Sequence, residues 1–177
     1  MVSDKYVRAV PGGVGYAKTG GNYAASVLAE KEANEQGYTQ VLWLDAVERR
    51  YIEEVGAMNI FFVINDEIVT PQLTGSILPG ITRMSVLELG KYWALEVSER
   101  RISIDEVLKG LKDGSVTEVF GAGTAAVISP VGALSYKEEE YQVGNGETGP
   151  IASRFYEQLT GIQFGKEPDP FDWVESF

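Results

Sequence analysis

The sequence predicts a mixed α/β fold in which most strands are antiparallel, and three observations support this. Short apolar segments bounded by turn residues outnumber the helical patterns. Two of these segments are joined by Asn65-Asp66, a dipeptide suited to a tight β-hairpin. Strands and helices do not alternate regularly, as they would in a doubly wound parallel sheet. With 177 residues, of which 44% are hydrophobic, we expect a single domain over residues 1–177.

The expected strands are short runs that end at glycine, proline or charged residues. The run at 40–44 is largely apolar, which indicates a buried strand, and a charged turn follows it. The run at 125–128 ends where Pro130 breaks the strand. The full set comprises residues 5–10, 40–44, 51–55, 59–64, 67–70, 97–102, 117–120 and 125–128, with an exposed edge hairpin over 136–143.

Three or four helices are expected from their start and stop signals. Asn22 can cap the first, Ser103 begins the third with a capping box, and Pro150 suits the first turn of the last. The expected ranges are 22–36, 81–92, from 103 to Gly110 or Gly114, and 150–159. One side of the first helix carries Ala24, Val27, Leu28 and Lys31.

The composition excludes several classes of chemistry. The chain has no histidine and no cysteine, which removes Ser-His-Asp triads, histidine bases, thiolate nucleophiles and the usual zinc sites. The formal net charge of −11 argues against nucleic acid and anionic membranes as partners. There is no run of 18 apolar residues and no signal-peptide pattern, so we expect a soluble cytoplasmic protein.

Lys18 is the first candidate catalytic residue. It lies among small and aromatic residues, and no charged residue occurs within four positions on either side. Desolvation in an apolar setting lowers the pKa of a lysine and makes its amine the nucleophile that Schiff-base chemistry requires. The plain alternative is a surface lysine in a glycine-rich turn, which is the commoner case for a lysine taken alone.

Two further side chains could act with Lys18. Glu54 lies between two apolar strands and precedes small residues, so its carboxylate could enter a pocket, although an outward-facing position fits equally well. Adjacent strand residues face opposite ways, and we expect Glu53 to face outward. Tyr23 follows Lys18 by five residues; its phenol could stabilise a ring oxyanion, or it could pack in the core.

Two glycine-containing segments could bind anions. Gly80 precedes an expected helix and is followed by Ile81 and Thr82, so free N–H groups and the helix dipole could hold a phosphate. The segment Gly121–Ala125 is a weaker candidate for phosphate or carboxylate. Each segment alone is more commonly an ordinary turn. Together, a lysine, a carboxylate, a phenol and two anion cradles are what pyridoxal phosphate requires, because that cofactor supplies its own electron sink.

The order and spacing of five motifs resemble the branched-chain-amino-acid aminotransferases, which are class IV (fold type IV) pyridoxal-phosphate enzymes. The resemblance covers nearly the whole chain and corresponds to the C-terminal half of those enzymes, a pseudo-barrel with surrounding helices. It is closer than the resemblance to D-amino-acid aminotransferases or aminodeoxychorismate lyases of the same class. The motifs are Lys18–Tyr23 (KTGGNY), Gln40–Leu44 (QVLWL), Glu54–Asn59 (EVGAMN), Leu78–Arg83 (LPGITR) and Phe120–Ala125 (FGAGTA).

The resemblance implies roles at the pyridine ring and in the reaction. Lys18 would form the Schiff base and move the proton, Glu54 would pair with the pyridine nitrogen, and Tyr23 would partner O3′. The reaction would transfer an amino group between leucine, isoleucine or valine and 2-oxoglutarate.

The resemblance also implies which residues bind the charged groups. Gly80, Ile81 and Thr82 would hold the cofactor phosphate with help from Thr124. The N–H groups of Thr124 and Ala125 would meet the substrate carboxylate.

Three departures from the family pattern affect these expectations. Ala126 and Ser129 stand where some relatives have a Cys-x-x-Cys pair, and Ala57 stands where some have threonine. We also expect these 177 residues to lack the family's N-terminal domain, which completes the phosphate site and the substrate pocket. We therefore expect the chain to fold alone, to bind cofactor weakly and to have little or no activity. The uncovered apolar surface should favour a homo-oligomer, as in the family's dimer.

Two alternatives remain open at this point. One is another fold type IV enzyme, either a D-amino-acid aminotransferase or an aminodeoxychorismate lyase. The other is a non-catalytic fragment that binds pyridoxal phosphate or has only a structural role.

Overall fold

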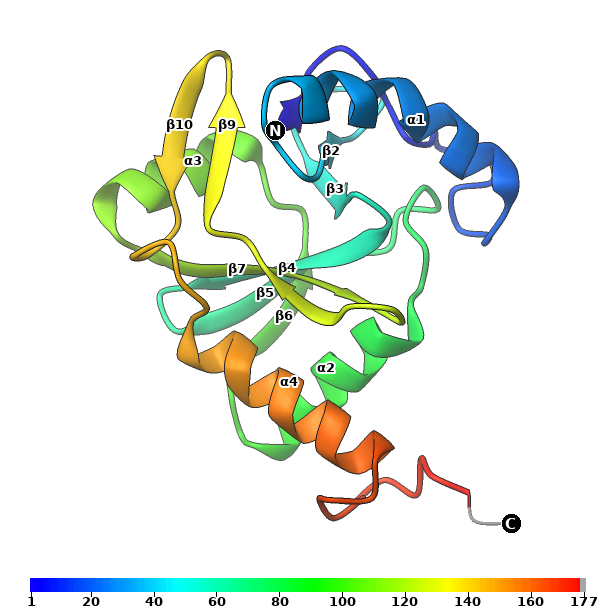
Figure 1. Cartoon of the computed structure of the whole chain (residues 1–177), viewed down its shortest axis with the longest axis vertical. Coiled ribbons are helices and arrows are strands. Elements are labelled where there is room, and N and C mark those ends of the chain that lie inside the picture. The colour runs from blue at the N-terminus through cyan, green and yellow to red at the C-terminus, as the bar shows by residue number, and fades with distance from the viewer. Residues whose placement is uncertain (176–177) are drawn as a thin grey trace.

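A computed structural model describes residues 1–175 and shows a mixed α/β architecture with mostly antiparallel strands (Figure 1). In chain order the elements are β1 (Val2–Ser3), α1 (Gly20–Glu35), β2 (Leu42–Leu44), β3 (Ile52–Val55), β4 (Met58–Ile64), β5 (Glu67–Pro71), α2 (Ile81–Tyr92), β6 (Val97–Arg100), α3 (Ile104–Asp113), β7 (Val116–Gly123), β8 (Val127–Pro130), β9 (Ala133–Tyr136), β10 (Glu139–Gln142) and α4 (Pro150–Gln163). Within the described residues, no helix is both long enough and apolar enough to cross a membrane.

Strand β4 is the centre of the main sheet. It pairs antiparallel with β3 near its start, with β5 near its end, and with β7 along its other edge. The pairs β1–β2 and β5–β6 are parallel. After β6 the chain returns to β3, where the Ile52 N–H donates to the Ile102 carbonyl at 2.9 Å and Tyr51 bridges Ser103. This closure gives the pseudo-barrel that the family resemblance implied.

Two hairpin turns have the backbone conformation that tight turns require. Both Asn65 and Asp66 have positive φ, at 49° and 66°, and they join β4 to β5 as expected from the sequence. Lys137 and Glu138 do the same between β9 and β10, which form a separate two-stranded sheet. Paired positive φ angles match the right-handed twist of the flanking strands.

Both faces of β4 are buried. Ile60, Phe62 and Ile64 belong to a cluster that includes the apolar face of α3, whereas Phe61 and Val63 belong to a second cluster with α2 and α4. In the second cluster Phe61 stacks on Phe120 of β7, with ring centroids 5.3 Å apart. Figure 1 shows α2 and α4 together on one side of the sheet and α3 on another. The site region is thus built on a rigid, doubly covered strand.

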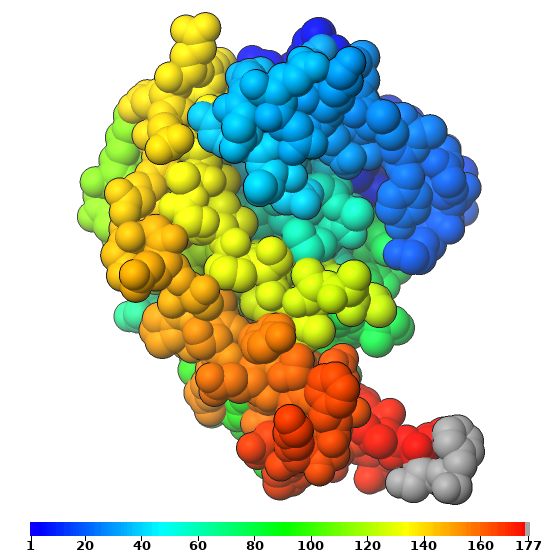
Figure 2. Space-filling view, in the orientation of Figure 1, coloured from blue at the N-terminus to red at the C-terminus, as the bar shows by residue number. Residues whose placement is uncertain are grey.

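Helix α1 packs through its small residues and exposes its larger apolar ones. Ala29 and Ala33 are buried against Val41 and Trp43. The opposite side, which the sequence marked as apolar, is in solvent: Val27 is 61% exposed and Leu28 is 53% exposed. This helix forms part of the visible surface in the space-filling view (Figure 2). The chain therefore presents an apolar helix face that no described residue covers.

Two expectations near the N-terminus are wrong. Residues 5–10 are not a strand, because the edge of β2 is already taken by Val2–Ser3 and Arg8 turns inward instead to contact the carbonyls of Gly15 and Ser76. Asn22 is not the cap of α1, which begins at Gly20 after Thr19.

Other element bounds differ more modestly. Strand β8 begins at Val127 rather than Ala125 and contains Pro130 as its last residue, because positions 124–126 form the turn from β7. Helix α4 continues to Gln163, four residues past the expected end, and begins at Pro150 as expected. The third helix starts as expected at Ser103, whose side chain accepts from the Glu106 N–H, and ends at Gly114, which has a φ of 82°. Strand β6 ends at Arg100, and the next residues continue as the closing bridge.

Candidate active site

Lys18 and Tyr23 are in direct contact at the start of α1. Lys18 Nζ donates to Tyr23 Oη at 3.1 Å. The position of Lys18 is set by Asn22, whose Nδ2 donates to the carbonyls of Val14 and Ala17 at 2.9 and 2.8 Å. Asn22 therefore anchors the Gly-rich segment rather than capping the helix. Lys18 is exposed in this chain, so the apolar enclosure expected from its sequence neighbours is not formed by these residues.

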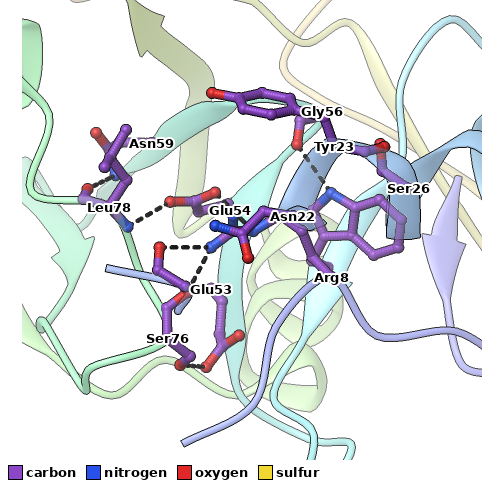
Figure 3. Close-up of polar contacts among 12 residues, drawn as sticks. Arg8, Asn22, Tyr23, Ser26, Glu53, Glu54, Gly56, Asn59, Ser76 and Leu78 are labelled. Atoms are coloured by element: carbon purple, nitrogen blue, oxygen red, sulfur yellow. Dashed lines mark hydrogen bonds and ion pairs between the residues drawn. The ribbon is translucent and has the colours of Figure 1, made fainter. Parts of the chain in front are cut away.

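Glu54 on β3 points into the molecule. It is 3% exposed, and its Oε1 accepts from the Leu78 N–H at 2.9 Å. Its Oε2 lies 2.8 Å from Nε of Arg8, whose side chain is also buried. Figure 3 shows Glu54 between Leu78 and Arg8, with the ring of Tyr23 above them. Of the two orientations that the sequence left open, the structure has the inward one.

Burial raises the pKa of the Glu54 carboxyl to about 7. The charge of Arg8, the Leu78 N–H and the charge of Lys18 each lower this pKa, whereas Glu53 raises it. Burial dominates because a carboxylate loses far more hydration than these partners restore. A carboxyl group in this range changes charge near neutral pH and responds strongly to any cation placed beside it.

The register of the sheet aligns the other motifs with Glu54. Glu54 lies opposite Asn59 on β4, and Asn59 lies opposite Ala122 on β7. Asn59 Nδ2 donates to the Leu78 carbonyl at 2.8 Å, so Leu78 is held by Glu54 through its N–H and by Asn59 through its C=O. This row together with Leu78 thus connects three of the five sequence motifs.

The N-terminus of α2 lies at this row. Gly80 is its N-cap and forms no side-chain cap, which leaves first-turn N–H groups available to an anion. A Cβ at position 80 would lie 2.3 Å from Asn59 Oδ1, so only glycine fits beside Asn59. Ile81 is 71% exposed and Thr82 is half-buried. The geometry suits phosphate binding by Gly80, Ile81 and Thr82.

The β7–β8 turn begins two residues after Ala122. Gly121 and Gly123 pack on the side chain of Met58, and a Cβ at either position would come within 2.9 or 3.1 Å of it. Thr124 and Ala125 follow in the turn and are exposed. The small residues here therefore allow β7 to pass close to the start of β4, and they place the turn at the same end of the sheet as Glu54.

The hollow that these residues form is small. A cavity of about 20 Å³ lies among Arg8, Asn22, Tyr23, Glu54 and Leu78. A pocket that encloses a ligand of drug-like size has a volume of roughly 300–1,000 Å³. The described residues thus form a floor for a ligand, but they do not surround one.

Sequence reasoning missed three members of this site. Arg8 was placed in a strand and assigned no role; the only signal was a charged residue within the otherwise apolar Val7–Val10. Glu53 was expected to face outward, but it is 4% exposed and its Oε1 accepts a hydrogen bond from the Ser76 hydroxyl. Ser76 is fully buried, and nothing in its sequence context marked it.

The pattern of an amine beside a phenol, a buried carboxylate and an open helix N-terminus on this fold defines the class of protein. The family model for Amino-transferase class IV matches residues 2–134, and the chain belongs to that family.

Several curated relatives carry a narrower name. The chain is 60% identical over 173 residues to branched-chain-amino-acid aminotransferase 2 of Bacillus subtilis (strain 168), covering 98% of this chain and 48% of that protein. It is 53% identical to the branched-chain-amino-acid aminotransferase of Mycobacterium tuberculosis (strain CDC 1551 / Oshkosh), again covering 98% of this chain and 48% of that protein. The chain thus spans about half the length of the curated relatives that it matches.

Solved structures agree with the architecture. The branched-chain amino acid aminotransferase of Escherichia coli superposes with a TM-score of 0.84 at 35% identity, covering 99% of this chain and 54% of that one. The T.th. branched-chain amino acid aminotransferase complexed with N-(5'-phosphopyridoxyl)-L-glutamate superposes with a TM-score of 0.83 at 32% identity, covering 98% of this chain and 54% of that one.

Proposed function

We propose that this chain is the pyridoxal-phosphate-binding part of a branched-chain-amino-acid aminotransferase. The whole enzyme transfers an amino group between leucine, isoleucine or valine and 2-oxoglutarate. The observation that carries the proposal is the contact of Lys18 Nζ with Tyr23 Oη at 3.1 Å, with Tyr23 lining the same hollow as the buried carboxylate of Glu54. The names of the relatives support the substrate class, and the phosphopyridoxyl ligand named for the T.th. protein supports the cofactor.

The residues present fit this cofactor. Lys18 provides the amine for covalent attachment, and Tyr23 provides a phenol at hydrogen-bond distance from that amine. Glu54 provides a carboxylate for the ring nitrogen, and the uncapped N-terminus of α2 provides N–H groups for the phosphate. Pyridoxal phosphate, when bound, supplies the electron sink that stabilises the substrate carbanion.

Each residue then has a defined task. Lys18 holds the cofactor and carries the proton that is removed from the substrate Cα. The Tyr23 hydroxyl orients the amine of Lys18. Glu54 keeps a proton on the ring nitrogen, which increases the electron demand of the ring. Thr82 and Thr124 contribute hydroxyl groups to the phosphate, and the N–H groups of Thr124 and Ala125 receive the substrate carboxylate.

The chain alone supplies only part of this site. Lys18 is exposed, and the hollow over Glu54 has a volume of about 20 Å³. We propose that a further domain, corresponding to the part of the relatives that this chain does not span, completes the pocket. The isolated chain is then expected to bind cofactor weakly and to turn over poorly.

Attachment of the cofactor provides the test. The chain is mixed with pyridoxal phosphate, reduced with borohydride and digested, and the modified peptide is identified by mass spectrometry. The proposal requires modification at Lys18. It also requires that the imine absorbance that appears on addition of pyridoxal phosphate be lost in Lys18→Ala but not in the exposed control Lys31→Ala. Modification spread evenly over the lysines would contradict it. Assays of the longer protein with L-leucine, D-alanine and aminodeoxychorismate then separate the three reactions of this enzyme class.

A further inference from the structure

Glu53 is a buried carboxyl that the proposed chemistry does not use. It precedes Glu54 on β3, yet both side chains are almost fully buried, at 4% and 3% exposed. Figure 3 shows the carboxylate of Glu53 turned toward Ser76, while that of Glu54 is turned toward Leu78. The two neighbouring carboxyl groups thus bind two residues of one segment, Ser76 and Leu78.

The segment that they hold contains no secondary structure of its own. It runs from β5 to α2, over residues 72–80, and its Leu78 N–H meets Glu54. Within it Ser76 has three partners: its hydroxyl donates to Glu53 Oε1 and contacts Thr74 Oγ1 at 3.0 Å, and its carbonyl accepts from Arg8 Nη2. Ser76 is therefore fixed through contacts on both its side chain and its backbone.

We infer that Glu53 is a positioning residue for the cofactor site: by holding Ser76, it fixes the segment that places the Leu78 N–H against Glu54 and Gly80 at the start of α2. This inference rests on the proposed function only where it concerns the cofactor. The positioning itself is a property of the chain without any ligand.

The charges of the cluster indicate how Glu53 acts. The charge of Arg8 acts on both carboxyl groups, and its Nε is 2.8 Å from Glu54 Oε2. Burial raises the pKa of Glu53, and the Ser76 hydroxyl and the Arg8 charge oppose this only in part. The ion pair of Arg8 is with Glu54, and the direct contact of Glu53 is the hydrogen bond from the Ser76 hydroxyl, so Glu53 acts here as a hydrogen-bond acceptor. An uncharged group of the same shape should replace it.

The first experiment measures the segment directly, in the ligand-free chain. Amide hydrogen exchange is followed for Leu78 in the wild type and in Glu53→Ala, Glu53→Gln and Ser76→Ala. We expect protection of the Leu78 N–H to fall at least about tenfold in Glu53→Ala and Ser76→Ala and to stay near wild type in Glu53→Gln. The amide of Phe62 reports global stability and should change far less. Equal loss at Leu78 and Phe62, or unchanged protection at Leu78, would overturn the inference.

The second experiment measures the consequence for the cofactor. Dissociation constants for pyridoxal phosphate are compared for the same variants and for the double variant Glu53→Ala/Ser76→Ala. We expect weakening of about tenfold in each single alanine variant and no further weakening in the double variant, since both remove one contact. Glu48→Ala is the matched control, because Glu48 lines a separate surface pocket together with Glu53 and is hydrogen-bonded to Arg101 rather than to Ser76. If the effects of the two single substitutions on the dissociation constant add in the double variant, or if Glu53→Ala binds with wild-type affinity, Glu53 does not act on the cofactor site through Ser76.

The two experiments separate this inference from the proposed function. If the wild-type chain takes up no pyridoxal phosphate at Lys18, the proposed function fails, while the exchange experiment still decides whether Glu53 positions Leu78. If the cofactor binds at Lys18 and the Glu53→Ala variant keeps wild-type Leu78 protection, only the inference fails.

Discussion

Nε of Arg8 lies 2.8 Å from Oε2 of Glu54, and both side chains are more than nine-tenths buried. The contact is an ion pair that lacks hydrogen-bond geometry. It connects the N-terminal segment, which is irregular, to the strand that carries the central carboxylate. Since the same guanidinium also donates to the Ser76 carbonyl, one side chain ties together three separate parts of the chain.

Replacement of Arg8 should be costly. Arg8→Met leaves the Glu54 carboxylate buried without its cation, and we expect the free energy of unfolding to fall by about 3–5 kcal/mol in urea denaturation at pH 8. The double variant Arg8→Met/Glu54→Gln should lose less than the sum of the two single changes, because it removes the uncompensated charge. Additive losses would show that the pair is not coupled.

The raised pKa of Glu54 predicts how stability depends on pH. The carboxyl titrates near 4.5 when unfolded and at about 7 when folded, so between these values the folded state holds more protons. The contribution of Glu54 to the free energy of unfolding is complete below pH 4.5 and is lost as the pH rises to about 7. The difference in pKa corresponds to about 3 kcal/mol. Glu54→Gln cannot titrate, so its free energy of unfolding should decline less over this window. Parallel pH profiles for the two proteins would refute the prediction.

Gly80 should not tolerate a side chain. An added Cβ would lie 2.3 Å from Asn59 Oδ1 and displace the contact of Asn59 with Leu78. We expect Gly80→Ala to reduce the free energy of unfolding by about 1–3 kcal/mol and to weaken cofactor binding. Gly21→Ala is the control for stability, because no atom lies within 4 Å of its added Cβ and alanine favours the helix by up to about 1 kcal/mol. Equal stability of the two variants would exclude the steric argument.

Helix α4 depends on a cap from another element. Its N-cap is Gly149, which has no side chain, and the N–H groups of Ile151 and Ala152 donate instead to the two oxygens of Glu118 on β7, each at 2.9 Å. Glu118→Ala should lower the free energy of unfolding by about 1–3 kcal/mol. Glu157→Ala, on the exposed side of α4, should change it by less than about 0.5 kcal/mol. Comparable losses in both variants would show that Glu118 is not the cap.

The exposed face of α1 predicts self-association of the isolated chain. Val27 and Leu28 are more than half exposed and lie close to Tyr23 on the same helix. We expect sedimentation velocity to show concentration-dependent association of the wild type, and Val27→Glu to reduce it. Lys31→Glu adds negative charge to the same helix without removing apolar surface and should have a smaller effect. A monomeric wild type at all concentrations would contradict the prediction.

The sequence by itself determined most of the local structure and which side chains are candidates for the chemistry. The Asn65-Asp66 turn, the Ser103 cap and the Pro150 start depend on residues within a few positions, and each was predicted correctly because the physical cause is local. Lys18, Tyr23 and Glu54 were singled out for the same reason. Their chemistry is a property of the side chains.

Tertiary structure alone decided which groups meet and which are buried. Glu53 was expected to face outward from the alternation along β3, but the segment over 72–80 covers it, and no local pattern encodes that contact. Arg8 is 68 positions from Ser76 in sequence, and only the folded chain brings the two residues together. The exposure of Lys18 likewise depends on what packs over it. Burial depends on contacts from distant parts of the chain, whereas turns, caps and side-chain chemistry are set by neighbouring residues. The sequence of this protein therefore reveals its turns, caps and side-chain chemistry far better than it reveals burial.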